Sequence, residues 1–232
     1  MTDAALLSRA QAYPFGVPRG SFSVRGGRRE PPLALEPGDR IALLTFGANA
    51  SPAALARKLA GTDAERDALP VVACALEGFD VVHSAHVSPY GSIPAALQAS
   101  PGTVVHLHLI FPTPAQFELI HATEGNYELA ELPAAGLRLD PVAAARPAGV
   151  RAYATRHGCL QLGGRQLALE AIAAERRTFE TIAQPDVLAH VRDELEPGAD
   201  LDEFILRPIR DPAVAAARTA QLRARAAPLG WR

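Results

Sequence analysis

This chain has few of the residues on which several large classes of protein depend. It contains two cysteines, Cys74 and Cys159, in distant segments, which excludes a disulfide framework and a Cys-x-x-Cys site. We therefore expect a reduced, cytoplasmic setting. No apolar run approaches the length that crosses a bilayer, so we expect a soluble protein without a membrane partner.

The chain also has no excess of charge of either sign. A formal net charge of −2 over 232 residues gives no long-range attraction to nucleic acid or to an anionic membrane. Lys58 is the one lysine, and arginine supplies the other cations. Together with abundant alanine and proline, this usage indicates the coding bias of a GC-rich prokaryotic genome rather than phosphate recognition.

Three regions differ in composition. Residues 1–38 begin with a short helical stretch at 4–12, and proline and glycine then follow at a density that opposes regular structure, which predicts an N-terminal arm. Residues 39–150 mix strand and helix patterns and form the expected central domain. Residues 151–232 are mainly helical in pattern and are expected to be an extension packed on the core.

The central patterns predict a sheet flanked by helices. Runs rich in Val, Ile, Leu and Phe predict strands at 40–46, 71–76, 79–87, 103–111 and 127–132. Helices are expected at 52–60 and 113–123, and the second opens with the cap and first-turn pair Thr113-Pro114. Strands alternating with single helices indicate an α+β fold with a mixed β-sheet.

In the last region we expect a hairpin-like pair at 153–162 and helices at 166–181, 185–195 and 212–227. Leu169, Ile172 and Phe179 share one face of the first of these helices. This face predicts that the extension is docked rather than free.

One strand–loop–helix junction has the pattern of an anion site. Ile41–Leu44 is a short apolar run, small residues follow, and Ser51-Pro52 begins a helix. Backbone N–H groups converge at such a junction and can bind a carboxylate or a phosphate. Glu124 adds a carboxylate at the end of a predicted helix. The two segments together predict an anion cradle with one acid/base group.

These residues resemble a known family. Phe46-Gly47-Ala48-Asn49 resembles the Tyr-Gly-Ser-Asn loop of the γ-glutamyl cyclotransferase-like family, and residues 51–59 resemble the helix that follows this loop. Glu124-Gly125-Asn126-Tyr127 is similar to the Glu and nearby Tyr that carry the family's catalytic acid/base. Intervening strand and loop segments match in the same order, so the resemblance covers residues 40–132.

The resemblance implies a mixed sheet or small barrel and a cofactor-free intramolecular acyl transfer. A γ-glutamyl amide would close on itself, releasing 5-oxoproline, or a related lactam, and an amine. Glu124 is the implied catalytic residue, since the attacking amine must lose a proton and the departing nitrogen must gain one. The implied substrate-binding residues are Thr45, Phe46, Gly47, Ala48, Asn49, Ala50 and Tyr127. The implied partner is then a small γ-glutamyl substrate. A homodimer is possible under this interpretation, and the sequence does not decide it.

The chain departs from the family at three positions, which favours a second interpretation. Phe46 and Ala48 replace residues that carry hydroxyl groups in the family. His106 stands where the family often has a glycine near the substrate, so we expect its side chain to narrow the site. The alternative function is a non-catalytic member that binds a small amino-acid-like molecule.

The histidines suggest a third interpretation, a metal-dependent hydrolase. His106 and His108 are two residues apart on a predicted strand and point to one face, and three imidazoles with an open position can hold zinc. However, His83 and His86 are three residues apart and face opposite sides. We therefore expect no metal site.

Overall fold

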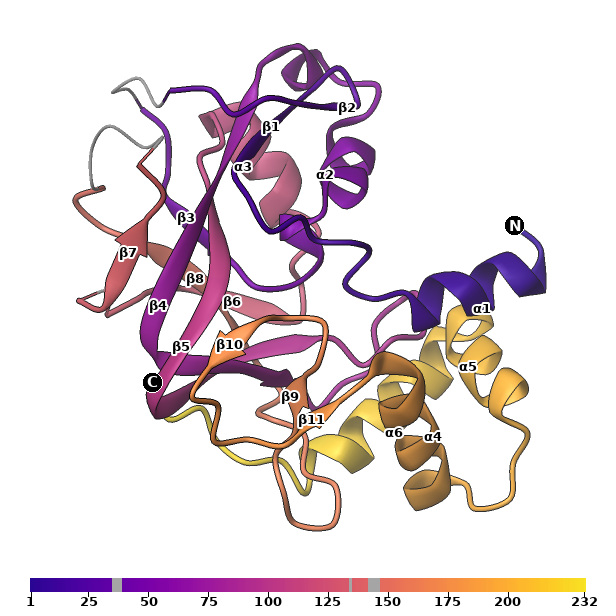
Figure 1. Cartoon of the computed structure of the whole chain (residues 1–232). Helices are drawn as coiled ribbons and strands as arrows, with labels where there is room; N and C mark the ends of the chain where they lie inside the picture. Colours follow the sequence, from indigo (N-terminus) through magenta and orange to yellow (C-terminus); the bar gives the residue numbers. More distant parts are fainter. Residues whose placement is uncertain (35–38, 134, 142–146) are drawn as a thin grey trace.

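A long antiparallel pair of strands, β4 and β5, runs through the centre of the molecule (Figure 1). The computed structural model describes residues 1–34, 39–133, 135–141 and 147–232. The strands are β1 (Phe22–Arg25), β2 (Arg28–Glu30), β3 (Leu43–Thr45), β4 (Leu69–His83), β5 (Ala95–Ile110), β6 (Tyr127–Glu131), β7 (Leu137–Leu139), β8 (Arg151–Thr155), β9 (Ala168–Leu169), β10 (Ala174–Glu175) and β11 (Thr181–Ile182). The helices are α1 (Asp3–Gln11), α2 (Pro52–Leu59), α3 (Pro114–His121), α4 (Gln184–Leu195), α5 (Leu201–Arg210) and α6 (Pro212–Arg223), with short 3₁₀ turns η1 (Ala48–Ala50) and η2 (Asp63–Arg66).

The described strands belong to one sheet, whose main path has the order β11-β9-β4-β5-β3-β8-β6. Neighbours on this path are antiparallel except for the parallel pairs β3–β8 and β9–β11. The protein is therefore α+β, with a mixed, open sheet flanked by helices. Because β8 pairs with β3, the sheet contains strands from both sides of the boundary expected at residue 150.

The strands predicted at 71–76 and 79–87 are a single strand, β4. Gly78, at φ +85°, lies at a register shift between Glu77 and Phe79, so it bends the strand without ending it. The partner strand β5 begins at Ala95 instead of the predicted residue 103 for a related reason. Its Pro101-Gly102 pair falls opposite the same irregularity, and pairing resumes on both sides.

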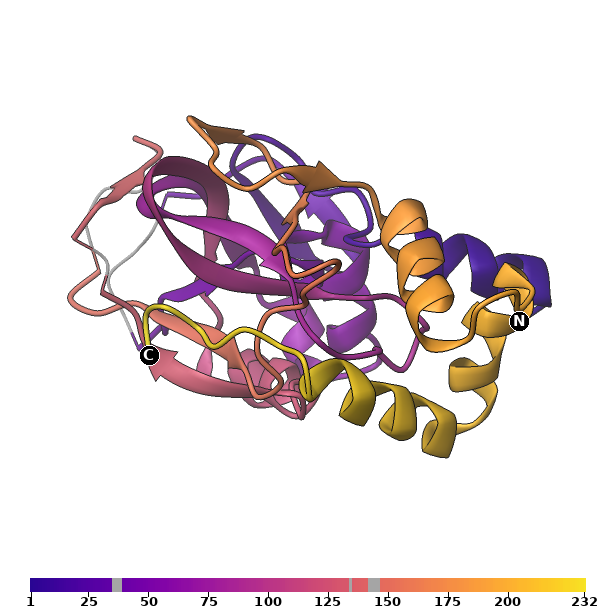
Figure 2. The same cartoon turned by 90° about the horizontal axis from the view of Figure 1, so that it is seen from below.

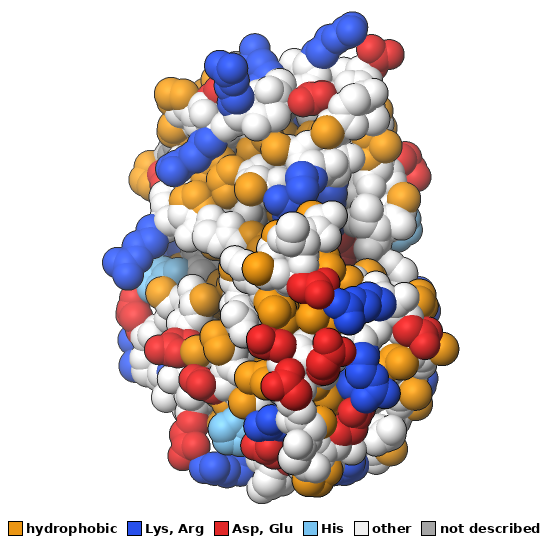
Figure 3. Space-filling view, turned by 90° about the vertical axis from the view of Figure 1, so that its right-hand side faces the viewer, with side chains coloured by type: hydrophobic (Ala, Val, Ile, Leu, Met, Phe, Trp, Pro, Cys, Tyr) orange, Lys and Arg blue, Asp and Glu red, His pale blue; other side chains and the backbone are white. Residues whose placement is uncertain are grey.

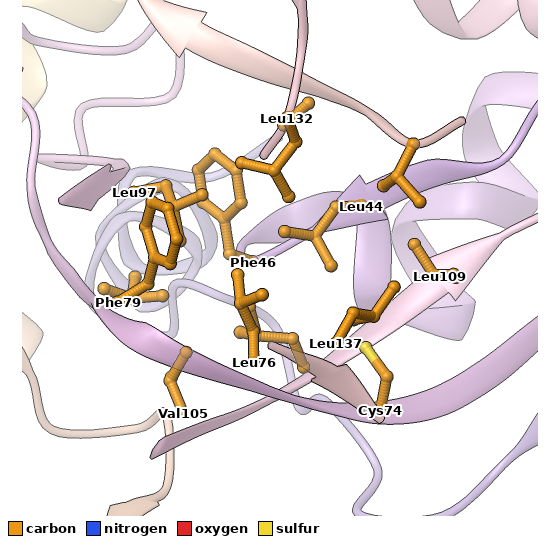
Figure 4. Close-up of a cluster of buried hydrophobic side chains, with 14 of the residues drawn as sticks. Leu44, Phe46, Cys74, Leu76, Phe79, Leu97, Val105, Leu109, Leu132 and Leu137 are labelled. Atoms are coloured by element: carbon orange, nitrogen blue, oxygen red, sulfur yellow. The ribbon is translucent and has the colours of Figure 1, made fainter. Parts of the chain in front are cut away.

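Helices pack on the sheet in two groups. Leu55 and Leu59 of α2 and Ile120 of α3 pack with β1, β4 and β5. The other group, α1, α4, α5 and α6, gathers at one end of the molecule (Figure 2), around buried residues such as Phe204 and Leu222. Between the groups, apolar residues of the central strands form the main core (Figure 4). Among the described residues, no helix is long and apolar enough to span a bilayer.

The expectation that glycine and proline prevent regular structure after the first helix was wrong. Residues 22–30 form the hairpin β1–β2, which pairs with β4 at the edge of the sheet. Gly26 and Gly27 have φ values of +54° and +71° and connect the paired residues Arg25 and Arg28. Two consecutive left-handed residues make the turn whose twist suits a two-residue hairpin.

The prediction of a helix at 166–181 was also wrong. Leu169 and Ile172 are buried as expected, but they lie on short strands and turns that border β4 and β5. Arg177 of this segment forms an ion pair with the fully buried Asp80, with Nε and Oδ2 2.8 Å apart. Buried side chains three residues apart therefore do not require a helix. A segment with an irregular backbone that follows a sheet edge can bury side chains at the same spacing.

The hairpin-like pair predicted at 153–162 is not formed. Residues 151–155 are β8, whose partners are β3 and β6. Cys159 pairs instead with Ser84 and Ala227 in isolated bridges. The backbone of the second half therefore bonds to the 83–85 segment and to the C-terminal segment rather than to the first half.

An acidic segment begins a helix that the patterns did not predict, α5. The Asp200 side chain accepts a hydrogen bond from the Glu203 N–H at 3.0 Å and caps this helix, whose first turn is acidic. Figure 3 shows acidic side chains gathered on the lower half of the side where α1 and α5 lie. Arg210 of α5 pairs with Asp3 of α1, Nη2 to Oδ2, at 2.7 Å, so part of this charge joins the two helices.

Candidate functional site

A cavity of about 490 Å³ opens beside the end of β3 and the start of α2. It brings together the two segments that the patterns singled out, although they are more than seventy residues apart in the chain. The predicted site residues that line it are Thr45, Phe46, Gly47, Ala48, Asn49, Glu124 and Tyr127. Ala50 does not line the cavity. It is buried, and its N–H donates to Gly47 O at 3.0 Å in the η1 turn.

The loop takes its shape from a 3₁₀ turn followed directly by a capped helix. Ser51 is the N-cap of α2, and its side chain accepts a hydrogen bond from the Ala54 N–H at 3.4 Å. Pro52 occupies the first turn, where its missing N–H costs nothing. The Ser51 hydroxyl also donates to Phe15 O at 2.8 Å, which attaches the N-terminal segment to the loop.

Glu124 is held at one carboxylate oxygen. Oε1 accepts from Lys58 Nζ at 2.7 Å and from Asn49 Nδ2 at 3.1 Å. The Thr123 hydroxyl lies 3.2 Å from Oε1, but its one hydrogen is directed to Ile120 O at 2.7 Å. Within the described ranges, no hydrogen bond reaches Oε2. The side chain is 12% exposed, so it lies at the cavity wall and not in open solvent. The two donors orient the carboxylate and leave its second oxygen available to a bound molecule.

Lys58 is a site residue that the sequence interpretation missed. Its ammonium lies 2.7 Å from Asn49 Oδ1 as well as from Glu124 Oε1, so it joins the loop to the catalytic candidate. Two of its three N–H groups are used in this way, and the third is available. The sequence held one signal for it: Lys58 is the single lysine of an arginine-rich chain, and it lies on the helix that follows the loop.

Tyr13, from the N-terminal region that we expected to be an arm, places its hydroxyl against the loop. The oxygen accepts a hydrogen bond from the Ala95 N–H at 3.0 Å. A Cβ atom added at Gly47 would overlap this oxygen. Part of the loop that we assigned to an anion is therefore already covered by a phenol.

All four tyrosines of the chain line the cavity: Tyr13, Tyr90, Tyr127 and Tyr153. The Tyr127 hydroxyl donates to Ala95 O at 2.9 Å. Burial, with nearby charges and hydroxyls adding to it, raises the pKa of Tyr13 and of Tyr127 well above the usual value, and that of Tyr90 to about 12. These phenols stay protonated at neutral pH.

Two of the three differences from the γ-glutamyl cyclotransferase-like pattern have a structural explanation. Phe46 is 6% exposed and belongs to the core beside Leu97 and Leu132 (Figure 4), an environment that suits a ring without a hydroxyl. Ala48 lacks the hydroxyl of the family's serine, and the Tyr13 side chain places a hydroxyl beside the loop from elsewhere in the chain. The expectation that His106 narrows the site was wrong, because His106 is exposed, lies outside the cavity and bonds to Glu175 at 3.0 Å.

The histidines considered for a metal site are separated. His108 is buried, with Nε2 3.3 Å from Gly20 O, and His83 is buried with Nδ1 3.3 Å from Ile93 O. No group of three histidine, cysteine or acidic side chains in the described part of the chain could hold a metal ion. Cys74 and Cys159 are buried and unpaired, and burial raises the pKa of each thiol to about 12. Neither thiol is activated as a nucleophile.

His86 is a further polar residue of the cavity wall that sequence interpretation did not assign to the site. Its Nδ1 lies 2.8 Å from the Ser84 hydroxyl, which in turn lies 2.6 Å from the Thr155 hydroxyl. Burial, assisted by the charge of His157, lowers the pKa of His86 to about 3. The imidazole is therefore neutral at physiological pH.

Comparison of the chain with family models, with curated proteins and with solved structures gives no significant match. The assignment of a function therefore depends on the residues of the cavity itself. The relation to the γ-glutamyl cyclotransferase-like family stays a prediction from sequence.

Proposed function

We propose that the cavity catalyses intramolecular acyl transfer on a γ-glutamyl amide, releasing 5-oxoproline, or a related lactam, and an amine. The observation that carries the proposal is the arrangement at Glu124. One oxygen is held by Lys58 and Asn49, and the other has no partner among the described residues, next to a loop that can bind an anion. Under the same proposal, the open sheet is a variant of the cyclotransferase-like fold.

The α-carboxylate of the substrate would lie between the 45–50 loop and Lys58. The Tyr13 hydroxyl lies against Gly47, so a bound carboxylate has less room at the loop than the strand–loop–helix pattern suggests. The third N–H of the Lys58 ammonium supplies a further donor, and a charged donor binds a carboxylate more strongly than a neutral amide does.

The reaction would then require only a folded substrate and one proton carrier. The α-amine attacks the γ-carbonyl carbon and transfers a proton to Glu124 Oε2. The bond from that carbon to the departing nitrogen breaks as this nitrogen takes the proton back. A well-placed acid/base of this kind contributes about 10²–10⁴-fold in rate. Holding the substrate in a reactive conformation supplies much of the remaining rate enhancement.

The test is to incubate purified protein with a panel of γ-glutamyl amino acids and amines and to measure 5-oxoproline. Glu124→Gln should lower turnover by about 10²-fold or more and leave substrate affinity nearly unchanged, because Gln keeps the shape of Glu but carries no proton. Glu118→Gln is the matched control, since Glu118 is an exposed glutamate of α3 outside the cavity. Normal turnover in Glu124→Gln would exclude the mechanism.

The same assay separates an enzyme from a non-catalytic binding protein. A protein that binds γ-glutamyl compounds but releases no 5-oxoproline would support the binding function. The double variant Phe46→Tyr/Ala48→Ser restores the two family residues. If this variant gains an activity that the natural chain lacks, the natural chain is a binder.

A further inference from the structure

Two arginines of the cavity wall come from different helices and lie on neighbouring aromatic rings. Arg9, in the last turn of α1, has its Cζ 5.2 Å from the centre of the Tyr90 ring. Arg57 of α2 has its Cζ 5.5 Å from the centre of the Phe15 ring. The two rings contact each other edge to face, with centroids 5.3 Å apart. This packing brings the two guanidinium groups close together at the same side of the cavity.

Neither arginine has an acidic partner among the described residues. Lys58 of the same cavity, by contrast, is paired with Glu124. Arg9 is half-buried, and its Nε is buried and makes no hydrogen bond within the described ranges. Arg57 is exposed at the cavity wall, and its partial burial, followed by the charge of Arg9, lowers its pKa from the ordinary value. The two like charges therefore repel each other where the cavity meets solvent, an arrangement that a bound anion would relieve.

The charge of the cavity wall defines the kind of anion. Its charged side chains are Arg9, Arg57, Lys58 and Glu124. The Lys58–Glu124 pair is internally neutral, so the two guanidinium groups leave two positive charges without compensation. A single carboxylate would neutralise one of them. A phosphate monoester carries nearly two negative charges at neutral pH and offers oxygens to a guanidinium on each side.

We propose that Arg9 and Arg57 bind a phosphate monoester group of the cavity ligand. Tyr90 and Phe15 hold the guanidinium planes in place, which reduces the entropy lost on binding. Naming the whole ligand as a γ-glutamyl amide of an aminoalkyl phosphate rests on the proposed function. The phosphate site itself does not.

Binding of the probe 2-aminoethyl phosphate, measured by calorimetry, tests the site without any turnover. Its matched control is 2-aminoethanesulfonate, a tetrahedral group of similar size with one negative charge. The phosphate should bind about tenfold or more tightly than the sulfonate. Arg9→Gln and Arg57→Gln should each weaken phosphate binding about tenfold or more, because each removes a charged hydrogen-bond donor. Arg66→Gln, at an exposed arginine outside the cavity, should leave it unchanged.

Three results would overturn the phosphate site. These are equal affinity for phosphate and sulfonate, unchanged affinity in the Arg9→Gln/Arg57→Gln double variant, and an equal loss in Arg66→Gln. Thermal melting of each variant shows that it is folded before binding is compared. Arg57→Lys, which keeps the charge but not the planar donor pair, should retain part of the affinity.

Release of 5-oxoproline then separates the two proposals. If γ-glutamyl-2-aminoethyl phosphate is turned over faster than γ-glutamyl ethylamide, and Arg57→Gln abolishes the difference, both proposals hold. Equal turnover of the two amides supports the acyl transfer and contradicts the phosphate site. Arginine-dependent phosphate binding without 5-oxoproline from any amide supports the site and contradicts the acyl transfer.

Discussion

The two walls of the cavity are built in different ways. One wall, which we call the loop wall, consists of Gly47, Asn49, Lys58, Glu124 and Tyr127. The other, the arm wall, consists of Arg9, Tyr13, Phe15, His86 and Tyr90. The loop wall is held by an ion pair and short polar contacts around one carboxylate. The arm wall is held by contacts between aromatic rings and by guanidinium groups that lie on them.

The difference shows which part of a site a sequence pattern reveals. The loop wall contains a cap, a turn and a helix end, which are local features. The arm wall depends on contacts between residues 9–15 and 86–95, which no local pattern joins. The walls meet where the Tyr13 hydroxyl touches Gly47 and Ala48. Each prediction below perturbs one wall or this meeting point, from the largest expected effect to the smallest.

Lys58→Met should have the largest effect, because it leaves the Glu124 carboxylate without its cation in a place that is 12% exposed. Removing one partner of a largely buried pair costs about 3 kcal/mol of unfolding free energy. Urea denaturation measures this loss, and Lys58→Arg, which keeps the charge, should recover much of it. A Met variant as stable as the natural protein would show that the ion pair does not hold the loop wall together.

Gly47→Ala should break the meeting point of the walls. The new Cβ would overlap the Tyr13 oxygen, and overpacking of this kind costs about 2 kcal/mol. Gly47 has φ −150°, outside the left-handed region that favours glycine, so the overlap with Tyr13 is the change that the prediction tests. The loss measured by denaturation should therefore shrink in a Tyr13→Phe background, where the overlapping atom is gone. Equal losses in both backgrounds would contradict a contact between the walls at this point.

Acid should weaken the arm wall through His86. Burial lowers the folded-state pKa of His86 to about 3, while the unfolded chain takes up the proton near pH 6.5. Because the unfolded state binds more protons, stability falls as the pH drops from 6.5 towards 3, by up to about 1.4 kcal/mol per pH unit. His86→Gln should flatten this dependence in denaturation experiments at a series of pH values. His106→Gln, at an exposed histidine, should not.

Tyr13→Phe should have the smallest effect of the four. It removes the acceptor of the Ala95 N–H, and a lost hydrogen bond of this type costs about 1 kcal/mol. It also removes the oxygen that lies against Gly47, so binding of a carboxylate at the loop should strengthen even as the protein becomes less stable. Calorimetry with 5-oxoproline checks the sign. Weaker binding would mean that the hydroxyl serves the ligand directly.

Several elements could be predicted because their signals are local. The caps Thr113 and Ser51, each followed by proline, mark the starts of α3 and α2. The predictions that were wrong concern elements whose structure depends on distant partners. Gly78 forms a bulge because β5 pairs on both sides of it. Residues 166–181 follow the sheet edge because β4 and β5 offer them partners there.

The sequence by itself determined the loop after β3, the helix that follows it and the position of Glu124 after α3. Each of these depends on residues within about one turn of the backbone, so the physical cause lies within the pattern. Tertiary structure alone decided that Lys58 reaches Glu124, that Tyr13 covers part of the loop and that Arg9 and Arg57 both line the cavity. These contacts join residues that are far apart in the chain, so no repeating pattern in the sequence indicates them. They form only when the sheet and its helices pack.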